Sequence, residues 1–288
     1  MINFSIKADS TTKYITFPFI KNNKSLESEV KCGLTLIPAG NMRFRWNEEN
    51  PVRKELLTSI SKNPVPLELI HSQTVVDIKN KNDTFKMQAD GMITKNPELM
   101  PVITVADCVP IYLYDSVTKV FGVVHSGWKG TGIIREAILL AQKNYGSKPE
   151  DFSVVIGPHI KNCCYIVNEE RAEYFRNNFS KDCVVELEKN GTCYCGGRGL
   201  PIVWNNGGGK LYRLSLEKAN LAVLEKTGVK SENIGVCSDC TCCTEICGSN
   251  RRQTAINIKE NNIDTSKLSV EEQSKLFTVM AAFTFSSN

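Results

Sequence analysis

Two histidines and a cysteine stand in short, unusual contexts, and all three residue types bind transition metals. The chain contains three histidines; two of them, His71 and His125, enclose Cys108 in sequence. Two imidazoles and one thiolate make a complete three-ligand set for zinc and leave a fourth coordination position open for water or substrate. An open position distinguishes a catalytic metal from a structural one. If the three side chains converge, the sequence predicts a metalloenzyme.

The same three residues also have a purely structural interpretation. A lone histidine is often a core residue with satisfied hydrogen bonds, and cysteine is among the residue types most often buried. The spacing of His71, Cys108 and His125 matches no local zinc-finger pattern. Spacing alone therefore leaves both interpretations open, and the surrounding residues must decide between them.

Short apolar runs precede Cys108 and His125 and are typical of buried strands. Val102–Val105 comes shortly before Cys108, and Val120–Val124 ends directly at His125. Near-continuous apolar runs of this length indicate strands buried on both faces. If these two strands are neighbours in one sheet, both side chains lie at one sheet edge, where ligand sites of α/β folds usually form. Similar runs occur at Ile111–Tyr114 and Val154–Ile156.

Helical patterns alternate with these strands. Apolar residues at helical spacing predict a helix from Ile133 that ends near Gly146, and further helices are expected over Glu169–Asn178 and Leu216–Thr227, the last ended by Gly228. The first helix follows a glycine-rich segment after His125. Small residues there let backbone N–H groups approach a ligand, and a helix N-terminus favours anions. The pattern therefore predicts an anion site beside the metal site.

The remaining segments predict one α/β domain with two additions. Residues 188–210 are rich in glycine and contain Cys193 and Cys195, as expected of a long loop or hairpin insertion. The tail after Ile258 is polar and then helical, with Ser269 and Glu272 as a capping box. The expected fold class is therefore α/β. A single mixed-sheet domain with flanking helices covers residues 1–258, and a C-terminal helical extension covers residues 259–288.

Composition excludes several classes of function. The apolar share of 41%, the charged share of 23% and the net charge of +4 describe an ordinary globular protein and do not indicate a nucleic-acid partner. The first residues lack the apolar core of a secretion signal, and no stretch approaches the roughly 18 apolar residues of a membrane span. We therefore expect a cytoplasmic monomer or small homo-oligomer with no membrane partner. Most of its twelve cysteines are then expected to be thiols.

The residues that flank the three candidate ligands closely resemble the motifs of one known family. Four motifs in the same order carry the resemblance: Ala89–Thr94, Val105–Pro110, Val124–Thr131, and Ile156–Pro158 with Cys163–Val167. They are similar to the laccase-domain family, also called the multicopper polyphenol oxidase-like or purine nucleoside phosphorylase family, which includes the peptidoglycan editing factor. The resemblance implies a single α/β domain that holds zinc, with copper also possible, through His71, Cys108 and His125.

The family resemblance also implies an activity. It implies phosphorolysis of adenosine, inosine, guanosine and methylthioadenosine to the base and ribose 1-phosphate, and deamination of adenosine. Deamination needs an activated water, and zinc lowers the pKa of bound water to about 7. Asp107, which adjoins a predicted ligand, is a candidate acid/base group, although neighbouring strand residues point to opposite faces. Phosphate needs cationic groups and backbone donors, and the candidate substrate-binding residues are Asn41, Arg53, Gly127, Gly130 and Arg251.

Three other functions remain open at the sequence level. One is a hydrolase that edits peptidoglycan precursors, which the family's editing-factor name implies. Another is a copper-dependent phenol oxidase, against which the small number of histidines argues. The last is a non-enzymatic, cysteine-rich metal-binding protein, because Cys237-x-x-Cys240 has the spacing of half a structural zinc site. The cluster continues with Cys242, Cys243 and Cys247, whereas Cys163 and Cys164 are expected to pack.

Overall fold

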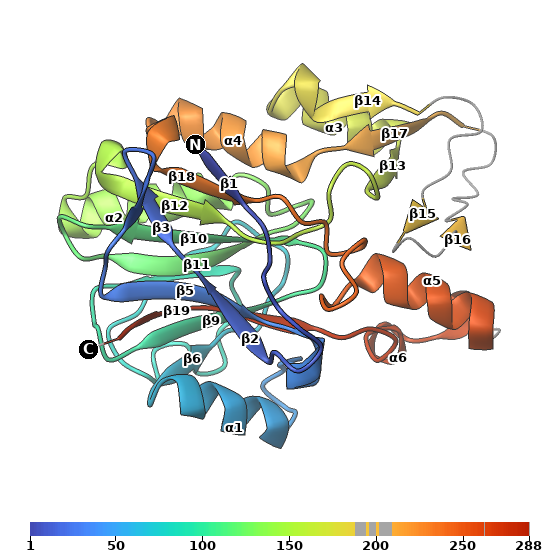
Figure 1. Ribbon diagram of the computed structural model, residues 1–288, viewed down its shortest axis with the longest axis horizontal. Helices are drawn as coiled ribbons and strands as arrows, with labels where there is room; N and C mark the ends of the chain where they lie inside the picture. The colour runs from blue at the N-terminus through green and yellow to red at the C-terminus, as the bar shows by residue number, and fades with distance from the viewer. Residues whose placement is uncertain (188–193, 196–199, 202–208, 262, 288) are drawn as a thin grey trace.

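Two large sheets organise the computed structural model, which describes the chain apart from residues 188–193, 196–199, 202–208, 262 and 288 (Figure 1). The seven-stranded sheet has the spatial order β1 (Ile2–Phe4), β18 (Ile234–Cys237), β12 (Phe152–Ile156), β10 (Val109–Asp115), β11 (Phe121–Ser126), β8 (Gly91–Thr94) and β7 (Val75–Asp77). The five-stranded sheet has the order β2 (Tyr14–Phe17), β5 (Val30–Thr35), β19 (Met280–Ser286), β9 (Met100–Val105) and β6 (Pro64–Pro66). Both sheets combine parallel and antiparallel pairs, which confirms the predicted mixed-sheet α/β class.

Smaller elements surround the two sheets. The helices are α1 (Pro51–Ile60), α2 (Ile133–Tyr145), α3 (Glu169–Asn178), α4 (Leu216–Thr227), α5 (Asn250–Asn261) and α6 (Val270–Gln273). Short 3-10 helices occupy Ile37–Ala39, Pro149–Asp151, Lys181–Cys183, Ser231–Asn233 and Thr265–Lys267. Strands β13 (Ile166–Asn168), β17 (Leu211–Leu214) and β14 (Val184–Glu186) form a small sheet, and β3 (Phe19–Lys21) pairs with β4 (Lys24–Leu26). Within the described part of the chain, no helix combines the length and apolar character that crossing a membrane requires.

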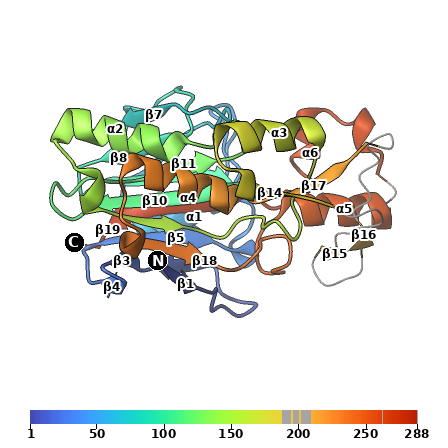
Figure 2. The same ribbon diagram turned by 90° about the horizontal axis from the view of Figure 1, so that it is seen from above.

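Side chains along the central strands alternate between two buried layers of the molecule. On β10, Ile111 and Leu113 belong to the core beneath α2, α3 and α4, whereas Tyr112 and Tyr114 belong to the core between the two sheets. Successive side chains of a strand point to opposite faces, so one buried strand supplies both cores. α1 covers the outer face of the five-stranded sheet. Figure 2 shows α2 and α4 side by side above the strands, with α5 and α6 together at one end.

The three predicted helices of the middle region are confirmed. α2 begins at Ile133, and α3 and α4 have the predicted limits. Gly146 and Gly228 follow α2 and α4 with φ of 71° and 96°, a left-handed conformation that glycine adopts at little cost. Asn168 accepts a hydrogen bond from the backbone of Arg171 and so caps the start of α3. These limits were predictable because the residues that end each helix are local.

The prediction of a helical C-terminal extension is wrong in its second half. The capping box forms, since the Ser269 hydroxyl accepts from the backbone of Glu272, but α6 ends at Gln273. The chain then continues into β19, which lies between β5 and β9 in the five-stranded sheet. Met280 through Phe283 are fully buried, because one face of β19 packs between the sheets and the other packs toward α1. Long-range pairing therefore outweighs the local helical pattern.

The predicted insertion at residues 188–210 lies largely outside the described residues, and the Cys193-x-Cys195 element lies there in part. Two short strands within it are described, β15 (Tyr194–Cys195) and β16 (Leu200–Pro201). They pair antiparallel, as expected of a hairpin.

Candidate metal centre and adjoining cavity

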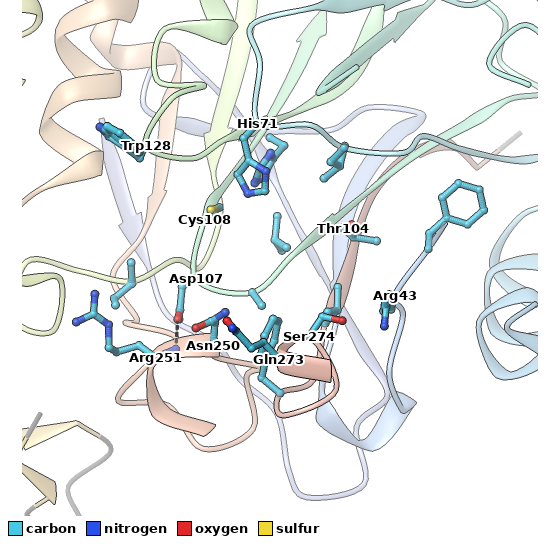
Figure 3. A pocket seen from close by; sticks show the side chains of 18 of the residues that line it. Arg43, His71, Thr104, Asp107, Cys108, Trp128, Asn250, Arg251, Gln273 and Ser274 are labelled. Carbon is cyan, nitrogen blue, oxygen red and sulfur yellow. Dashed lines mark hydrogen bonds between the residues drawn. The ribbon is translucent and has the colours of Figure 1, made fainter. Parts of the chain in front are cut away.

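The three predicted metal ligands converge at one point. The donor atoms of His71, Cys108 and His125 all lie within 4.8 Å of one another. The two imidazole rings meet edge to face, with their centroids 4.9 Å apart. His71 is exposed, Cys108 is partly buried and His125 is buried, so the centre faces a cavity on one side (Figure 3).

The strands that bring Cys108 and His125 together are arranged differently from the pattern considered in the sequence analysis. The strand before Cys108 is β9, which belongs to the five-stranded sheet, whereas His125 belongs to β11 of the seven-stranded sheet. The two strands are therefore not neighbours in one sheet. The chain crosses between the sheets at residues 106–108 and enters β10, which runs antiparallel to β11 with Pro110 opposite His125. Cys108 consequently reaches His125 from the start of β10.

Glycine 127 is required by close packing against the ligands. A Cβ atom at Gly127 would lie 2.9 Å from the Cys108 sulfur and 3.5 Å from ring atoms of both His71 and His125. A Cβ at Gly130 would lie 2.8 Å from the carbonyl oxygen of Ser72 and 3.1 Å from that of His125. The glycine-rich segment thus holds the ligand-bearing segments together. The role of Gly127 and Gly130 in substrate binding stays a prediction.

A buried carboxylate, Asp90, organises both histidine segments. Its Oδ1 lies 2.9 Å from Nδ1 of His125 and accepts the backbone N–H of His71, also at 2.9 Å. Its Oδ2 accepts from the backbone and hydroxyl of Ser72 at 2.6 and 2.7 Å. This network helps to hold His71 at φ +60°, which is unusual for a residue other than glycine. With Nδ1 of His125 held by a carboxylate, Nε2 is left for a metal, the usual arrangement of metal-ligating histidine.

Asp90 is not among the predicted site residues, although it lies in one of the family-like motifs. The available signal was an acidic residue directly before the apolar strand Gly91–Thr94. A carboxylate in such a position must be paired if it is buried, and Asp90 is fully buried. Its partners, however, come from two other segments of the chain, which only the fold brings together.

The electrostatics of the centre favour a thiolate. Burial opposes the charged forms of both Cys108 and His125, but the two groups compensate each other. The His125 imidazole lowers the pKa of the Cys108 thiol, and Cys108 together with Asp90 raises the pKa of His125. The thiolate is the form of cysteine that binds metal. Two imidazoles, one thiolate, a side-chain-free cradle at Gly127 and an orienting carboxylate therefore fit a zinc ion with one open position.

A cavity of about 420 Å³ adjoins the three ligands, a volume suited to a small organic molecule. Figure 3 shows His71 and Cys108 on one side and Asn250, Arg251 and Gln273 on the other. Aromatic and apolar side chains supply much of the remaining wall, namely Phe44, Leu69, Trp128, Tyr165 and Phe277. Arg43 and Arg45 add further positive charge. Gln273, Ser274 and Phe277 come from the predicted C-terminal extension, which therefore contributes to the site.

Asp107 and Arg251 line the cavity and are joined to each other. Asp107 accepts the backbone N–H of Arg251 at 2.7 Å and the hydroxyl of Thr241 at 2.6 Å (Figure 3). Burial, followed by the nearby Cys242, raises the pKa of Asp107 to about 6. Asp107 has φ +84° and lies where the chain crosses between sheets, so strand alternation does not apply there. Asp107 and Cys108 can therefore both line the cavity.

Asn41 and Arg53 lie behind the cavity wall and are not among the residues that line it. The Asn41 side chain donates to the carbonyl of Phe277 and accepts the backbone N–H of Val279, both at 3.2 Å. Arg53 is 8% exposed, and its guanidinium carbon lies 4.6 Å from the centre of the Phe44 ring. Phe277, Val279 and Phe44 line the cavity. The predicted direct contact of Asn41 and Arg53 with substrate stays a prediction.

Comparison with known proteins identifies the family of the chain. Residues 48–256 match the family described as multi-copper polyphenol oxidoreductase laccase. The chain is 36% identical over 117 residues to a purine nucleoside phosphorylase of Borreliella burgdorferi, covering 40% of this chain and 51% of the relative. It is 32% identical over 154 residues to the purine nucleoside phosphorylase YlmD of Bacillus subtilis, covering 53% and 49%. The chain thus spans about half the length of these curated relatives.

A solved structure shares the fold. The hypothetical protein YfiH of Bacillus licheniformis superposes with a TM-score of 0.68 at 23% identity, covering 89% of this chain and 92% of that protein. The likeness covers most of both chains and supports the α/β architecture.

Proposed function

Because the chain belongs to the multi-copper polyphenol oxidoreductase laccase family, we propose that it is a zinc-dependent purine nucleoside phosphorylase. The proposed reaction takes adenosine, inosine, guanosine or methylthioadenosine with phosphate and yields the base and the corresponding ribose 1-phosphate. One observation carries the proposal: a three-donor centre opens onto a cavity that is also lined by aromatic rings and arginines. The names of the two relatives given above support the same reaction.

The cavity supplies contacts for both substrates. Aromatic residues such as Trp128 and Tyr165 offer apolar faces to a purine ring. Arg251, with its guanidinium carbon 5.9 Å from the centre of the Tyr165 ring, is the candidate phosphate ligand, because arginine binds phosphate through paired N–H donors. In the reaction the bond from C1′ to the purine nitrogen breaks, a bond from C1′ to a phosphate oxygen forms, and the departing base takes up a proton.

His71, Cys108 and His125 would hold the zinc ion, and Asp90 would orient His125. When bound, zinc supplies a Lewis acid that polarises a substrate oxygen or activates water. Both oxygens of Asp107 already accept hydrogen bonds, so its geometry favours holding the Arg251 segment over transferring a proton. The open position would also serve adenosine deamination, the second reaction proposed for this site.

Copper-dependent oxidation is the less favoured alternative. The chain has three histidines, and the third, His159, is fully buried with Nδ1 2.7 Å from the carbonyl oxygen of Gly157. It does not line the cavity. Multicopper sites draw on many imidazole ligands, whereas one site with two imidazoles and a thiolate suits zinc. Hydrolytic editing of peptidoglycan precursors keeps the same centre and differs in the substrate.

The test is release of purine base from adenosine and inosine, with and without phosphate, by wild type and Cys108→Ala. Phosphate-dependent release that collapses in the variant is the expected result. Conversion of adenosine to inosine without base release would show that the protein deaminates adenosine and does not cleave nucleosides. If folded, zinc-loaded protein turns over neither nucleoside, the phosphorylase proposal is wrong, and peptidoglycan precursors become the substrates to assay.

A further inference from the structure

A second group of metal-binding side chains lies outside the cavity. The sulfur atoms of Cys163, Cys164, Cys240 and Cys243 all lie within 4.8 Å of one another. Cys163 and Cys164 precede β13, and Cys240 and Cys243 follow β18. A β-bridge between His159 and Cys240 joins the two segments, and the Thr241 N–H donates to the His159 carbonyl at 3.1 Å. The backbone therefore fixes the approach of the two cysteine pairs.

The spacing of the sulfur atoms fits one tetrahedral ion. The Sγ–Sγ distances are 3.7 Å for Cys163–Cys164, 3.9 Å for Cys163–Cys243 and 3.3 Å for Cys164–Cys243. A zinc ion with four Zn–S bonds of about 2.3 Å holds its sulfurs about 3.8 Å apart. An iron–sulfur cluster places several irons among its cysteines and so holds the thiolates farther apart. The observed distances match a single ion.

We propose that Cys163, Cys164, Cys240 and Cys243 bind one zinc ion in a closed four-thiolate site. This site shares no residue with the centre formed by His71, Cys108 and His125. Four protein thiolates fill the tetrahedral shell and leave no position for substrate, which is typical of structural zinc. The site accounts for part of the cysteine cluster at residues 237–247, whose spacing alone did not reveal a complete ligand set.

The surroundings suit a charged metal–thiolate group. The backbone N–H of Lys161 lies 3.3 Å from the Cys240 sulfur, and such a donor stabilises and orients a thiolate. Arg213 donates to the carbonyl of Cys163 at 2.8 Å and brings positive charge near the site. Cys164 and Cys240 are buried, whereas Cys163 and Cys243 are exposed. The ion would therefore be anchored from within and could enter from solvent.

The other cysteines of the cluster belong to the protein core. Cys237, Cys242 and Cys247 are fully buried and lie outside the group of four. The structure thus replaces the predicted half-site Cys237-x-x-Cys240 with Cys240-x-x-Cys243. The partners of Cys240-x-x-Cys243 are Cys163 and Cys164, for which packing was expected.

The proposed zinc site would brace one wall of the cavity. Thr241, next to Cys240, donates its hydroxyl to Asp107 at 2.6 Å. Tyr165, next to Cys164, lines the cavity directly. A metal bound by these cysteines would therefore hold Asp107 and Tyr165 in place without touching substrate.

Metal analysis of the purified full chain tests the proposal. Inductively coupled plasma mass spectrometry should find about two zinc ions per wild-type chain and about one in Cys108→Ala. The double variant Cys163→Ser/Cys243→Ser, which changes only exposed positions, should retain about one, and combining it with Cys108→Ala should leave about none. Cys242→Ala, a change to a neighbouring cysteine outside the ligand set, is the matched control and should keep about two.

Cobalt substitution provides a second readout in the Cys108→Ala background. Cobalt-loaded Cys108→Ala should show intense sulfur-to-cobalt charge-transfer bands. These bands should vanish when Cys163 and Cys243 are also replaced. Loss of all metal from Cys108→Ala, or full metal retention by the double variant, would overturn the proposal. A disulfide among the four cysteines would also overturn it, and would appear as one zinc ion in wild type. Iron in place of zinc would overturn the assignment of the metal.

Discussion

The proposed catalytic centre and the proposed four-cysteine zinc site differ in donor number and in what surrounds the donors. His71, Cys108 and His125 present three donors beside a cavity, whereas Cys163, Cys164, Cys240 and Cys243 present four donors beside the protein surface. Three donors leave a coordination position to substrate, and four donors leave none. Under the two proposals, zinc serves chemistry at the three-donor centre and rigidity at the four-donor site, because the number of protein ligands differs.

The sharpest way to break this comparison is to remove one ligand from the catalytic centre. Cys108→Ala deletes the thiolate of that centre, and we expect phosphorolysis to fall on the order of 100-fold or more, since even outer partners of metal ligands contribute 10–100-fold. The measurement is kcat/KM for inosine at saturating phosphate, together with zinc content. Unchanged kcat/KM in a variant that has lost its zinc would show that the metal plays no part in the reaction.

Asp90 tests how much the catalytic centre depends on orientation. Asp90→Asn keeps the shape but removes the charge that holds His125 and the Ser72 segment. We expect zinc affinity to fall about 10–100-fold with a parallel loss of kcat. Competition with a chromogenic chelator measures the affinity. Asp83→Asn, at an exposed carboxylate that accepts two backbone N–H groups, is the control and should change neither quantity. Equal effects of the two variants would contradict the proposed role.

Gly127 tests steric fit at the catalytic centre. Gly127→Ala places a Cβ 2.9 Å from the Cys108 sulfur, and we expect about tenfold weaker zinc binding with little change in folding stability. Gly146→Ala is the complementary variant, because nothing lies within 4 Å of its Cβ but its φ is +71°. That variant should destabilise the fold by about 1 kcal/mol and leave zinc binding intact. Zinc titration and urea unfolding of both variants would separate contact from backbone strain, and the reverse pattern would refute the assignment.

Local sequence signals predicted the helices well and predicted sheet membership poorly. Gly146 and Gly228 mark helix ends through their own backbone preference, so each limit could be predicted from neighbouring residues. The place of β19 depends on pairing with β5 and β9, which come from distant parts of the chain. The crossing of the chain between sheets just before Cys108 has the same origin.

The two proposed metal sites show that local sequence signals also miss ligands that come from separate segments of the chain. His71, Cys108 and His125 could be chosen in advance because their flanking motifs resemble a known family. Asp90 lay within such a motif, yet its function depends on partners from two other segments. The four cysteines form two short pairs, each ambiguous by itself, and the His159–Cys240 bridge makes them one group. Ligand sets built across segments require the fold, since spacing describes only one segment at a time.

Removing ligands from the four-cysteine site should have the smallest effect on catalysis. This variant tests the difference between the two sites directly. Cys163→Ser/Cys243→Ser should lose the structural zinc while His71, Cys108 and His125 keep theirs. We expect KM for the nucleoside to rise a few-fold with kcat nearly unchanged, because Tyr165 and the Thr241–Asp107 contact adjoin the lost ligands. Thermal unfolding should shift to lower temperature, since bound metal stabilises only the folded state.

Whether the double variant changes kcat or KM decides what the four-cysteine site does. A structural ion acts on the position of the cavity wall, so binding should weaken while the chemical step is preserved. If the double variant instead lost kcat as severely as Cys108→Ala, the four-thiolate group would belong to the catalytic machinery. Cys242→Ala controls for disturbance of the same loop, and its KM should match that of wild type. The contrast between the two regions therefore depends on one comparison: loss of kcat at the three-donor centre against a rise in KM at the four-donor site.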